Sequence, residues 1–245
     1  MTVPRLRMFA GPNGSGKSTL KTAVPARLLE RYLNPDDIEA EIRRSGHFDL
    51  AALGVGANGS EVRDYFLRSA FLASAGLTTD AARIGYFEDR IDFAAVAVNS
   101  YFASVLTDFL RRKLLAFKLS FSFETVMSAP DKVELLRIAQ QAGYRTYLYF
   151  VATDDPAINV ARVRQRVLAG GHDVPADKIV TRYHRSLELA SEAVGWTNRA
   201  YFFDNSGSQL VWIAEVTDGT HAVSKTTPIN EWFRAAVWDR LAPAV

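Results

Sequence analysis

Residues 11–18 read Gly-Pro-Asn-Gly-Ser-Gly-Lys-Ser, which has the spacing G-x-x-x-x-G-K-[ST] of a phosphate-binding loop. Glycine lets consecutive backbone N–H groups turn inward on phosphate oxygens, and the following helix adds the positive end of its dipole. Lys17 would neutralise the β- and γ-phosphates, and the Ser18 hydroxyl would be a Mg²⁺ ligand. An apolar stretch precedes the motif and a helical pattern follows it, so the motif predicts a nucleotide site. Its binding residues are then Gly11, Pro12, Asn13, Gly14, Ser15, Gly16, Lys17, Ser18 and Thr19.

Other motifs narrow the class of nucleotide-binding protein. A GTPase would carry N/T-K-x-D to read guanine, and an ABC-type ATPase would carry an LSGGQ-like signature, but the chain has neither. Motor ATPases usually show a pair of acids at the end of an apolar strand, whereas "YFFDNS" ends in the single acid Asp204. A small-molecule or nucleotide kinase needs only a phosphate loop, a carboxylate on the acceptor side and a basic lid.

The segment "YLNPDDIEAE" supplies a first candidate carboxylate. It follows an expected short strand, and ligands bind beyond the carboxyl ends of parallel strands. Asp36 or Asp37 could therefore accept the proton of a substrate hydroxyl during phosphoryl transfer. Capping of the next helix by Asp36, with Glu39 as the matching acid, explains the same pattern. The spacing leaves both explanations open.

The strand "KLSFSFETVMS" supplies a second acidic position, because apolar and polar residues alternate up to Glu124 and Thr125. A strand end in a parallel sheet faces the ligand region, so both residues are candidates for contact with substrate or Mg²⁺. An ordinary charged strand end is the other explanation.

Arginines recur on single faces of two expected helices. Arg162 and Arg166 are four residues apart, opposite a stripe of valines, and Arg182 and Arg185 repeat the arrangement on the next helix. Like charges at this spacing repel each other, so the helix gains nothing from them unless an anion lies between. In a chain with a phosphate loop, this pattern favours Arg162 and Arg166 as transition-state arginines and Arg182 as a substrate-side lid arginine. A solvated basic face is the other explanation.

The stretch between these two helices predicts a lid with a glycine hinge. Gly170 and Gly171 end the first helix, and Pro175 helps to start the second. A metal site at His172 and Asp173 is not expected, because neighbouring side chains point apart and no second ligand has the required spacing.

Apolar runs alternate with helical patterns, which predicts an α/β fold with a mainly parallel sheet. The expected strands are 6–10, 32–33, 116–123, 146–151 and 200–203, and the expected helices are 17–30, 103–115, 131–142, 156–169 and 177–194. The C-terminal extension, about 208–245, should contain a hairpin turning at Asp218-Gly219 and a last helix from Thr227-Pro228. Residues 47–95 fit the alternation poorly, so we treat them as a helical insertion in a single domain spanning 1–245.

Composition excludes several classes of site. The chain has 245 residues, of which 48% are hydrophobic and 23% charged, and its net charge is only +2, so it has no overall bias toward nucleic acid or anionic membranes. Absent cysteine excludes disulfides, thiolate zinc sites and a cysteine nucleophile. The N-terminal apolar run is too short for a signal peptide, and the most apolar stretch, 92–106, is broken by Asn99 and Ser100. We therefore expect a cytoplasmic protein with no membrane partner.

Six stretches together resemble the zeta toxin-like P-loop kinases. In chain order they are "GPNGSGKST", "NPDDI", "FSFETVMS", "GYRTYLYFVATDDPAINVARVRQRV", "GGHDVPADKIVTRYHRSL" and "YFFDNSG", covering roughly residues 5–45 and 98–207. The resemblance implies a three-layer phosphotransferase fold related to nucleoside and adenylate kinases. The best-known members of the family phosphorylate the 3′-hydroxyl of the sugar in UDP-N-acetylglucosamine and are restrained by an antitoxin.

The resemblance also implies roles for individual residues. Asp36, rather than Asp37, matches the acceptor-activating aspartate. The remaining matches are Lys17 and Ser18 in the phosphate loop, Glu124 and Thr125 at the sugar nucleotide, and Arg162 and Arg166 at the phosphates. The sequence departs from the toxins where Asn34 replaces the first acid of the acceptor motif and no His-Pro follows. The "GGHDVP" loop and the 47–95 insertion are not toxin-like either.

The expected function is an ATP- and Mg²⁺-dependent kinase for a hydroxyl of a small molecule, such as the nucleotide sugar UDP-N-acetylglucosamine, with an antitoxin protein as an expected partner. A nucleotide-controlled binding module for a protein or nucleic acid is the other hypothesis, but a mere switch would not need Asp36 and Glu124. A polynucleotide kinase would need a basic stripe, and the acidic insertion does not provide one.

Overall fold

The computed structural model describes residues 3–171 and 173–241, so His172 lies outside the described residues. The chain divides into two compact units. Unit 1 comprises residues 1–30 and 121–245, and unit 2 comprises residues 31–120. Within the described ranges, no helix combines the length and apolar character that crossing a membrane requires.

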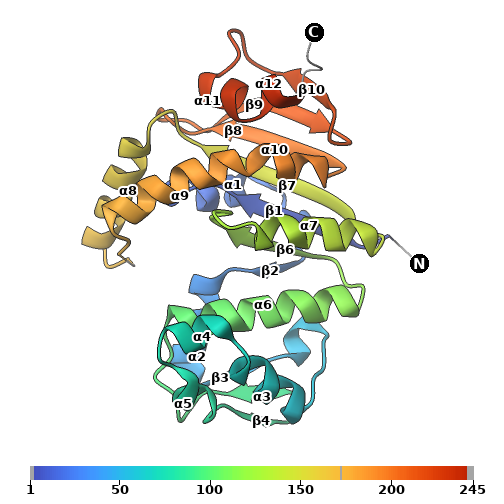
Figure 1. Cartoon of the computed structure of the whole chain (residues 1–245), viewed down its shortest axis with the longest axis vertical. Coiled ribbons are helices and arrows are strands. Elements are labelled where there is room, and N and C mark those ends of the chain that lie inside the picture. Colours follow the sequence, from blue (N-terminus) through green and yellow to red (C-terminus); the bar gives the residue numbers. More distant parts are fainter. Residues whose placement is uncertain (1–2, 172, 242–245) are drawn as a thin grey trace. The chain divides into compact units, whose positions relative to one another are not determined.

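Unit 1 is built on a mainly parallel sheet (Figure 1). Its strands are β1 (Arg5–Ala10), β6 (Phe121–Thr125), β7 (Arg145–Ala152), β8 (Arg199–Asp204), β9 (Val211–Thr217) and β10 (His221–Ser224). They follow the order β10-β9-β8-β7-β1-β6. The first four of these strands in the chain pair in parallel, whereas β9 and β10 form an antiparallel extension. The carboxyl ends of β1, β6, β7 and β8 therefore meet at one edge, where ligands bind in sheets of this kind.

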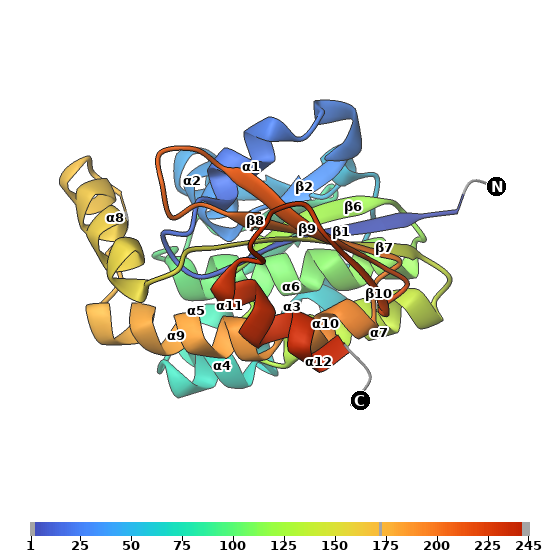
Figure 2. The same cartoon turned by 90° about the horizontal axis from the view of Figure 1, so that it is seen from above.

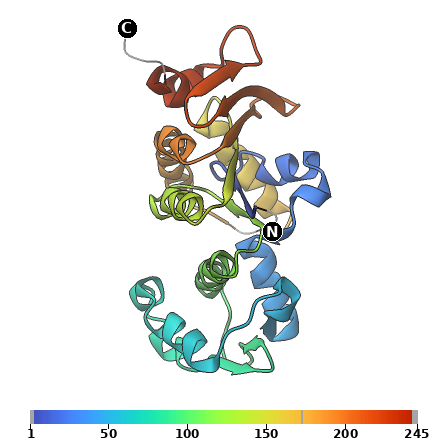
Figure 3. The same ribbon diagram turned by 90° about the vertical axis from the view of Figure 1, so that its right-hand side faces the viewer.

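Helices cover both faces of this sheet, which confirms the three-layer α/β fold (Figure 2). The helical segments of unit 1 are α1 (Lys17–Ala23), η1 (Ala26–Leu28), α7 (Asp131–Gln141), α8 (Pro156–Leu168), α9 (Ala176–Glu188), α10 (Ala190–Gly195), α11 (Glu231–Phe233), the π-helical turn η3 (Arg234–Trp238) and α12 (Asp239–Leu241). In Figure 3, α1 lies on one side of the strands and α7 and α10 lie on the other. On the latter side, the rings of Phe202 and Phe233 pack with centroids 4.8 Å apart.

Local signals explain where several elements begin. Asp155 caps α8 by accepting a hydrogen bond from the Ala157 N–H at 2.7 Å, and Pro156 occupies the first turn. The β9–β10 hairpin turns at Asp218 and Gly219, where both residues have positive φ and the Thr220 N–H donates to the Thr217 carbonyl O at 3.2 Å. The predicted hairpin is thus confirmed.

Several element boundaries differ from the prediction: the first helix ends at Ala23 rather than at residue 30, and the helix expected over 177–194 is divided into α9 and α10. Residues 116–120 do not start β6, because α6 (Ser100–Ala116) continues to Ala116 and the strand begins at Phe121. Alternating phenylalanines misled the prediction, since Phe117 is 49% exposed rather than part of a buried strand face. The last helix begins at Glu231 with Asn230 as its cap, not at Thr227-Pro228.

Unit 2 has its own core and a small antiparallel sheet. Besides α6, its elements are β2 (Arg31–Leu33), α2 (Pro35–Ser45), β3 (His47–Asp49), η2 (Ala51–Leu53), α3 (Gly59–Leu67), α4 (Ala70–Ser74), α5 (Thr78–Ala81), β4 (Gly85–Phe87) and β5 (Arg90–Asp92). The short strands pair in the order β3-β5-β4, and none of the three is predicted from the sequence. Buried Phe66, Phe93 and Phe102 pack edge to face in the core.

Candidate functional site

The phosphate loop lies between β1 and α1 and has the backbone shape that its glycines allow. Gly14 and Gly16 have φ of +73° and +101°, a region that L side chains rarely adopt. The Lys17 ammonium is buried and donates hydrogen bonds to the carbonyl oxygens of Gly11 (2.9 Å) and Pro12 (3.0 Å). The lysine side chain therefore folds back over the loop. A bound polyphosphate would replace some of its hydrogen bonds to the carbonyl oxygens.

Two buried asparagines brace the loop from outside its own sequence. The Asn159 amide in α8 donates to the Asn13 carbonyl O at 2.6 Å, and the Asn205 amide, just after β8, donates to the Ser15 carbonyl O at 2.8 Å. Space is tight near both asparagines, because a Cβ on Gly14 would lie 2.6 Å from the Asn159 carbonyl O and one on Gly16 would lie 2.1 Å from Asn205 Nδ2. Side chains from α8 and from the segment after β8 thus hold the loop backbone in place.

Two side-chain oxygens and one hydroxyl of this loop are suited to bind a phosphate and its metal ion. Within the described residues, the buried Ser15 Oγ and Asn13 Oδ1 have no hydrogen-bond partner. Buried polar atoms of this kind are normally satisfied, and a bound polyphosphate with its metal and water would supply partners. Ser18 follows Lys17 on the first turn of α1 and is exposed, so its hydroxyl is accessible as the predicted metal ligand.

The predicted arginines lie on α8, whose first turn contacts this loop, and on α9, which packs against α8. Arg162 in α8 is half-buried, and its Nη2 donates to the Gly207 carbonyl O at 3.2 Å, which ties α8 to the segment after β8. Its Nη1 is buried without a hydrogen-bond partner among the described residues. Arg166 is exposed one turn further along, and Arg182 is half-buried on α9. Gly170, at φ +87°, follows the end of α8 as predicted.

Glu124 and Thr125 lie at the carboxyl end of β6, as predicted. Glu124 is paired in register with Phe9 of the neighbouring β1, and Thr125 with Ala10, immediately before the phosphate loop. Thr125 Oγ1 accepts a hydrogen bond from the Met127 N–H at 3.0 Å, which shapes the turn after the strand. The two residues therefore stand on the strand beside the one that carries the loop.

Asp36 belongs to unit 2, in the first turn of α2. The helix is capped by Asn34, whose side chain accepts from the Asp36 N–H at 2.8 Å, and Pro35 occupies the first helical position. Capping by Asp36 with Glu39 is therefore wrong, because Asn34 is the cap and Asp36 already lies inside the first turn of the helix. The Asp36 side chain is exposed and is not the cap.

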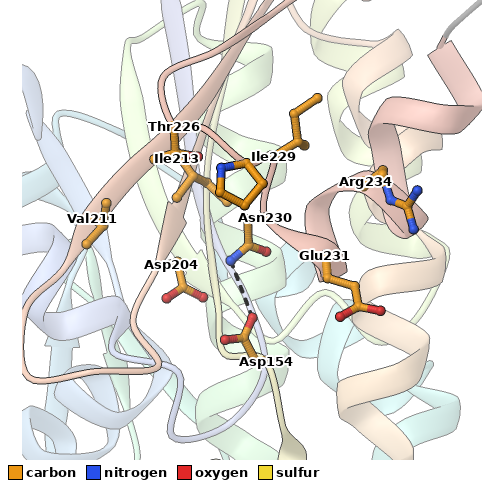
Figure 4. A pocket seen from close by; sticks show the side chains of 10 residues that line it. Asp154, Asp204, Val211, Ile213, Thr226, Ile229, Asn230, Glu231 and Arg234 are labelled. Carbon is orange, nitrogen blue, oxygen red and sulfur yellow. Dashed lines mark hydrogen bonds between the residues drawn. The ribbon is translucent and has the colours of Figure 1, made fainter.

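A pocket of about 820 Å³ borders the two segments that brace the loop (Figure 4). The carboxylates of Asp154 and Asp204 point toward each other there, and Asn230 donates to Asp154 at 3.3 Å. Arg234 points away from both acids. The lining residues are Asp154, Asp204, Val211, Ile213, Thr226, Pro228, Ile229, Asn230, Glu231 and Arg234, so no residue predicted for the nucleotide or acceptor lines it.

Sequence reasoning missed the bracing residues Asn159 and Asn205. A signal existed for Asn159, because it falls four residues before Val163 on the buried face of α8, where an amide needs a specific partner. For Asn205 the sequence offers only its place at the end of a strand.

Comparison with known proteins places the chain in a family. The model of the family described as Zeta toxin matches residues 87–213, slightly more than half of the chain. The chain belongs to the zeta toxin family. The matched segment contains Glu124, Thr125 and the arginines of α8 and α9, whereas the phosphate loop and Asp36 of this family member precede it.

Individual relatives are distant. An uncharacterized protein of Haemophilus influenzae is 28% identical over 65 residues, which is 26% of this chain and 46% of that protein, so the chain spans less than half of it. The solved AvrRxo1-ORF1:AvrRxo1-ORF2 complex with sulphate ions is similar at a TM-score of 0.53 and 14% identity, over 92% of this chain and 62% of that one. The same pair with ATP matches at 0.52 and 15%, over 91% and 61%.

A structure from the PezAT chromosomal toxin–antitoxin system of Streptococcus pneumoniae is similar at a TM-score of 0.51 and 13% identity. This match covers 97% of the zeta toxin family member and 80% of the PezAT chain. At such identities the likeness concerns the fold alone.

Proposed function

We propose that this protein is an ATP-dependent kinase that transfers the γ-phosphate to a hydroxyl of a small molecule. The observation that carries the proposal is the braced phosphate loop, in which Lys17 is buried over the loop carbonyls and the buried Ser15 hydroxyl has no partner among the described residues. Family membership and a similar complex solved with ATP support the same reading.

The chain's own residues would divide the work as follows. Lys17 moves from the loop carbonyls to the β- and γ-phosphates, and Arg162 and Arg166 offset the charge that develops on the transferred group. Asp36 orients the acceptor hydroxyl and accepts its proton, while Glu124, Thr125 and Arg182 hold the acceptor. Ser18 would hold a Mg²⁺ ion, which would supply positive charge to offset that of the phosphate oxygens.

UDP-N-acetylglucosamine is the first acceptor to test, because zeta toxin-like kinases suggest it. Asn34, where those toxins have an acid, and the lack of a following His-Pro favour testing other nucleotide sugars, nucleosides and phosphorylated metabolites alongside it. We place the activity in the cytoplasm, where ATP and such acceptors are found.

The decisive experiment incubates the purified protein with γ-labelled ATP, Mg²⁺ and this panel of acceptors. We expect one acceptor to become labelled, with no label in the Lys17→Ala protein or without Mg²⁺. Slow ATP hydrolysis with no labelled acceptor would reject the kinase and favour a nucleotide-controlled switch.

We further propose that the protein acts as the toxin of a toxin–antitoxin pair, supported by the family and by the PezAT structure. Its expression should arrest growth, and the product of an adjoining reading frame should relieve the arrest. Growth that is equally slow with wild-type protein and with Lys17→Ala would contradict a toxic kinase activity.

A further inference from the structure

A buried chain of hydrogen bonds links the phosphate loop to both arginine-bearing helices. The Tyr183 hydroxyl of α9 donates to the Thr153 carbonyl O at 2.6 Å. The Thr153 hydroxyl donates to Asn159 Oδ1, with the Asp155 carbonyl O as a longer second acceptor at 3.2 Å. Asn159 Nδ2 then donates to the Asn13 carbonyl O in the phosphate loop at 2.6 Å.

We call this chain of hydrogen bonds from Tyr183 through Thr153 and Asn159 to Asn13 the relay. Its burial fixes which group donates and which accepts at each step. Thr153 and Asn159 are 0% exposed and Tyr183 is 3% exposed, so water does not compete for these groups. The Asn13 carbonyl can only accept, and the amide NH₂ of Asn159 must therefore face it while the amide oxygen faces Thr153. Burial, followed by the nearby Asp154, Asp155 and Asp204, raises the pKa of Tyr183 to about 12, so its hydroxyl stays a donor at neutral pH.

Backbone packing reinforces the same link. A Cβ placed on Gly14 would lie 2.6 Å from the Asn159 carbonyl O, so the first turn of α8 touches the phosphate loop directly. A shift of the backbone at residues 13–14 would therefore displace the first turn of α8, because the Asn159 side-chain amide and the helix backbone are already in close contact with the loop.

We propose that Asn159 is a positioning residue that transmits occupancy of the phosphate loop to α8 and α9, and so sets the Arg162, Arg166 and Arg182 side chains. This inference rests on the proposed nucleotide binding.

Hydrogen exchange measured by mass spectrometry, with and without a non-hydrolysable ATP analogue, tests the proposal. In wild-type protein, the analogue should slow exchange in the phosphate loop and also in peptides from α8 and α9. In Asn159→Ala, the loop should keep its response and both helices should lose theirs. In Tyr183→Phe, which removes one hydroxyl and keeps the ring, only α9 should lose its response.

Ser186→Ala is the matched control, because Ser186 is buried on α9 and its Oγ has no hydrogen-bond partner among the described residues. This variant should keep the response of both helices. An α8 or α9 response that persists in Asn159→Ala, or an α9 response that persists in Tyr183→Phe, would overturn the relay. Should Asn159→Ala fail to fold, the response of α9 in Tyr183→Phe decides whether the relay exists. No response anywhere in the wild-type protein would instead reject the proposed nucleotide binding.

Discussion

At the residue scale, Lys17 and Asp36 have separable expected roles. In the proposed mechanism, Lys17 contacts the nucleotide whether or not transfer occurs, whereas Asp36 acts only on the acceptor. Lys17→Ala should weaken ATP binding by about 1.5–3 kcal/mol, the usual worth of a hydrogen bond to a charged group, and abolish transfer. Asp36→Asn should bind ATP normally and lower kcat by about 10²–10⁴-fold, as loss of a general base does. Calorimetric titration and label transfer measure the two effects, and full transfer by Asp36→Asn removes it from the reaction.

Gly16 offers a second residue-scale prediction, because its side chain space is already taken by Asn205. Gly16→Ala combines a left-handed backbone with a Cβ 2.1 Å from Asn205 Nδ2. It should displace the brace on Ser15 and abolish ATP binding. Gly143→Ala is the control, since Gly143 also has positive φ but nothing within 4 Å of the new Cβ. That control should cost only the backbone strain, about 1–2 kcal/mol, and bind ATP as wild type. Equal ATP binding by both variants would show that the Asn205 contact is dispensable.

The phosphate loop itself was predictable because its chemistry lies within eight consecutive residues. Its braces were not, since Asn159 and Asn205 reach the loop from 146 and 190 residues away. Such contacts depend on the order of the strands in the sheet. The residues around an asparagine do not indicate which distant group it will contact. The site was thus predictable where it is local in sequence and was missed where tertiary packing completes it.

At the element scale, the start of α2 decides how Asp36 is presented. Asn34 caps the helix, so Asn34→Ala should lower the free energy of unfolding by about 1 kcal/mol and Asn34→Ser should restore most of it. Because Asp36 N–H is the capped group, transfer activity should fall and recover in parallel. Urea unfolding and label transfer give the two readouts. Unchanged activity in a destabilised Asn34→Ala protein would show that the cap serves stability alone.

Elements with strong local signals were predictable, including α8 with its Asp-Pro start and the hairpin at Asp218-Gly219. The strand β6 was placed too early because alternating phenylalanines occur both at the end of α6 and in the strand. The sheet of β3, β4 and β5 was missed because each strand has only three residues, too few for a periodic pattern.

At the scale of the whole molecule, the fold joins two units with separate cores, each with its own sheet and buried aromatic cluster. Unit 1 carries every residue proposed to hold the nucleotide, and unit 2 carries Asp36. Burying the relay in unit 1 makes the stability of this unit depend on keeping Tyr183 neutral.

Alkaline pH should therefore reveal the relay in the stability of the protein. The pKa of Tyr183 is about 12 in the native state and about 10 in an unfolded chain. Below pH 10 both states keep the proton, so the hydroxyl contributes fully. As pH rises from 10 toward 12, only the unfolded chain releases it, and the free energy of unfolding falls by about 1.4 kcal/mol per pH unit. Tyr183→Phe lacks this titration, so its deficit relative to wild type should shrink above pH 10 in urea unfolding series. A deficit that stays constant with pH would mean that Tyr183 titrates normally and is not the buried donor described here.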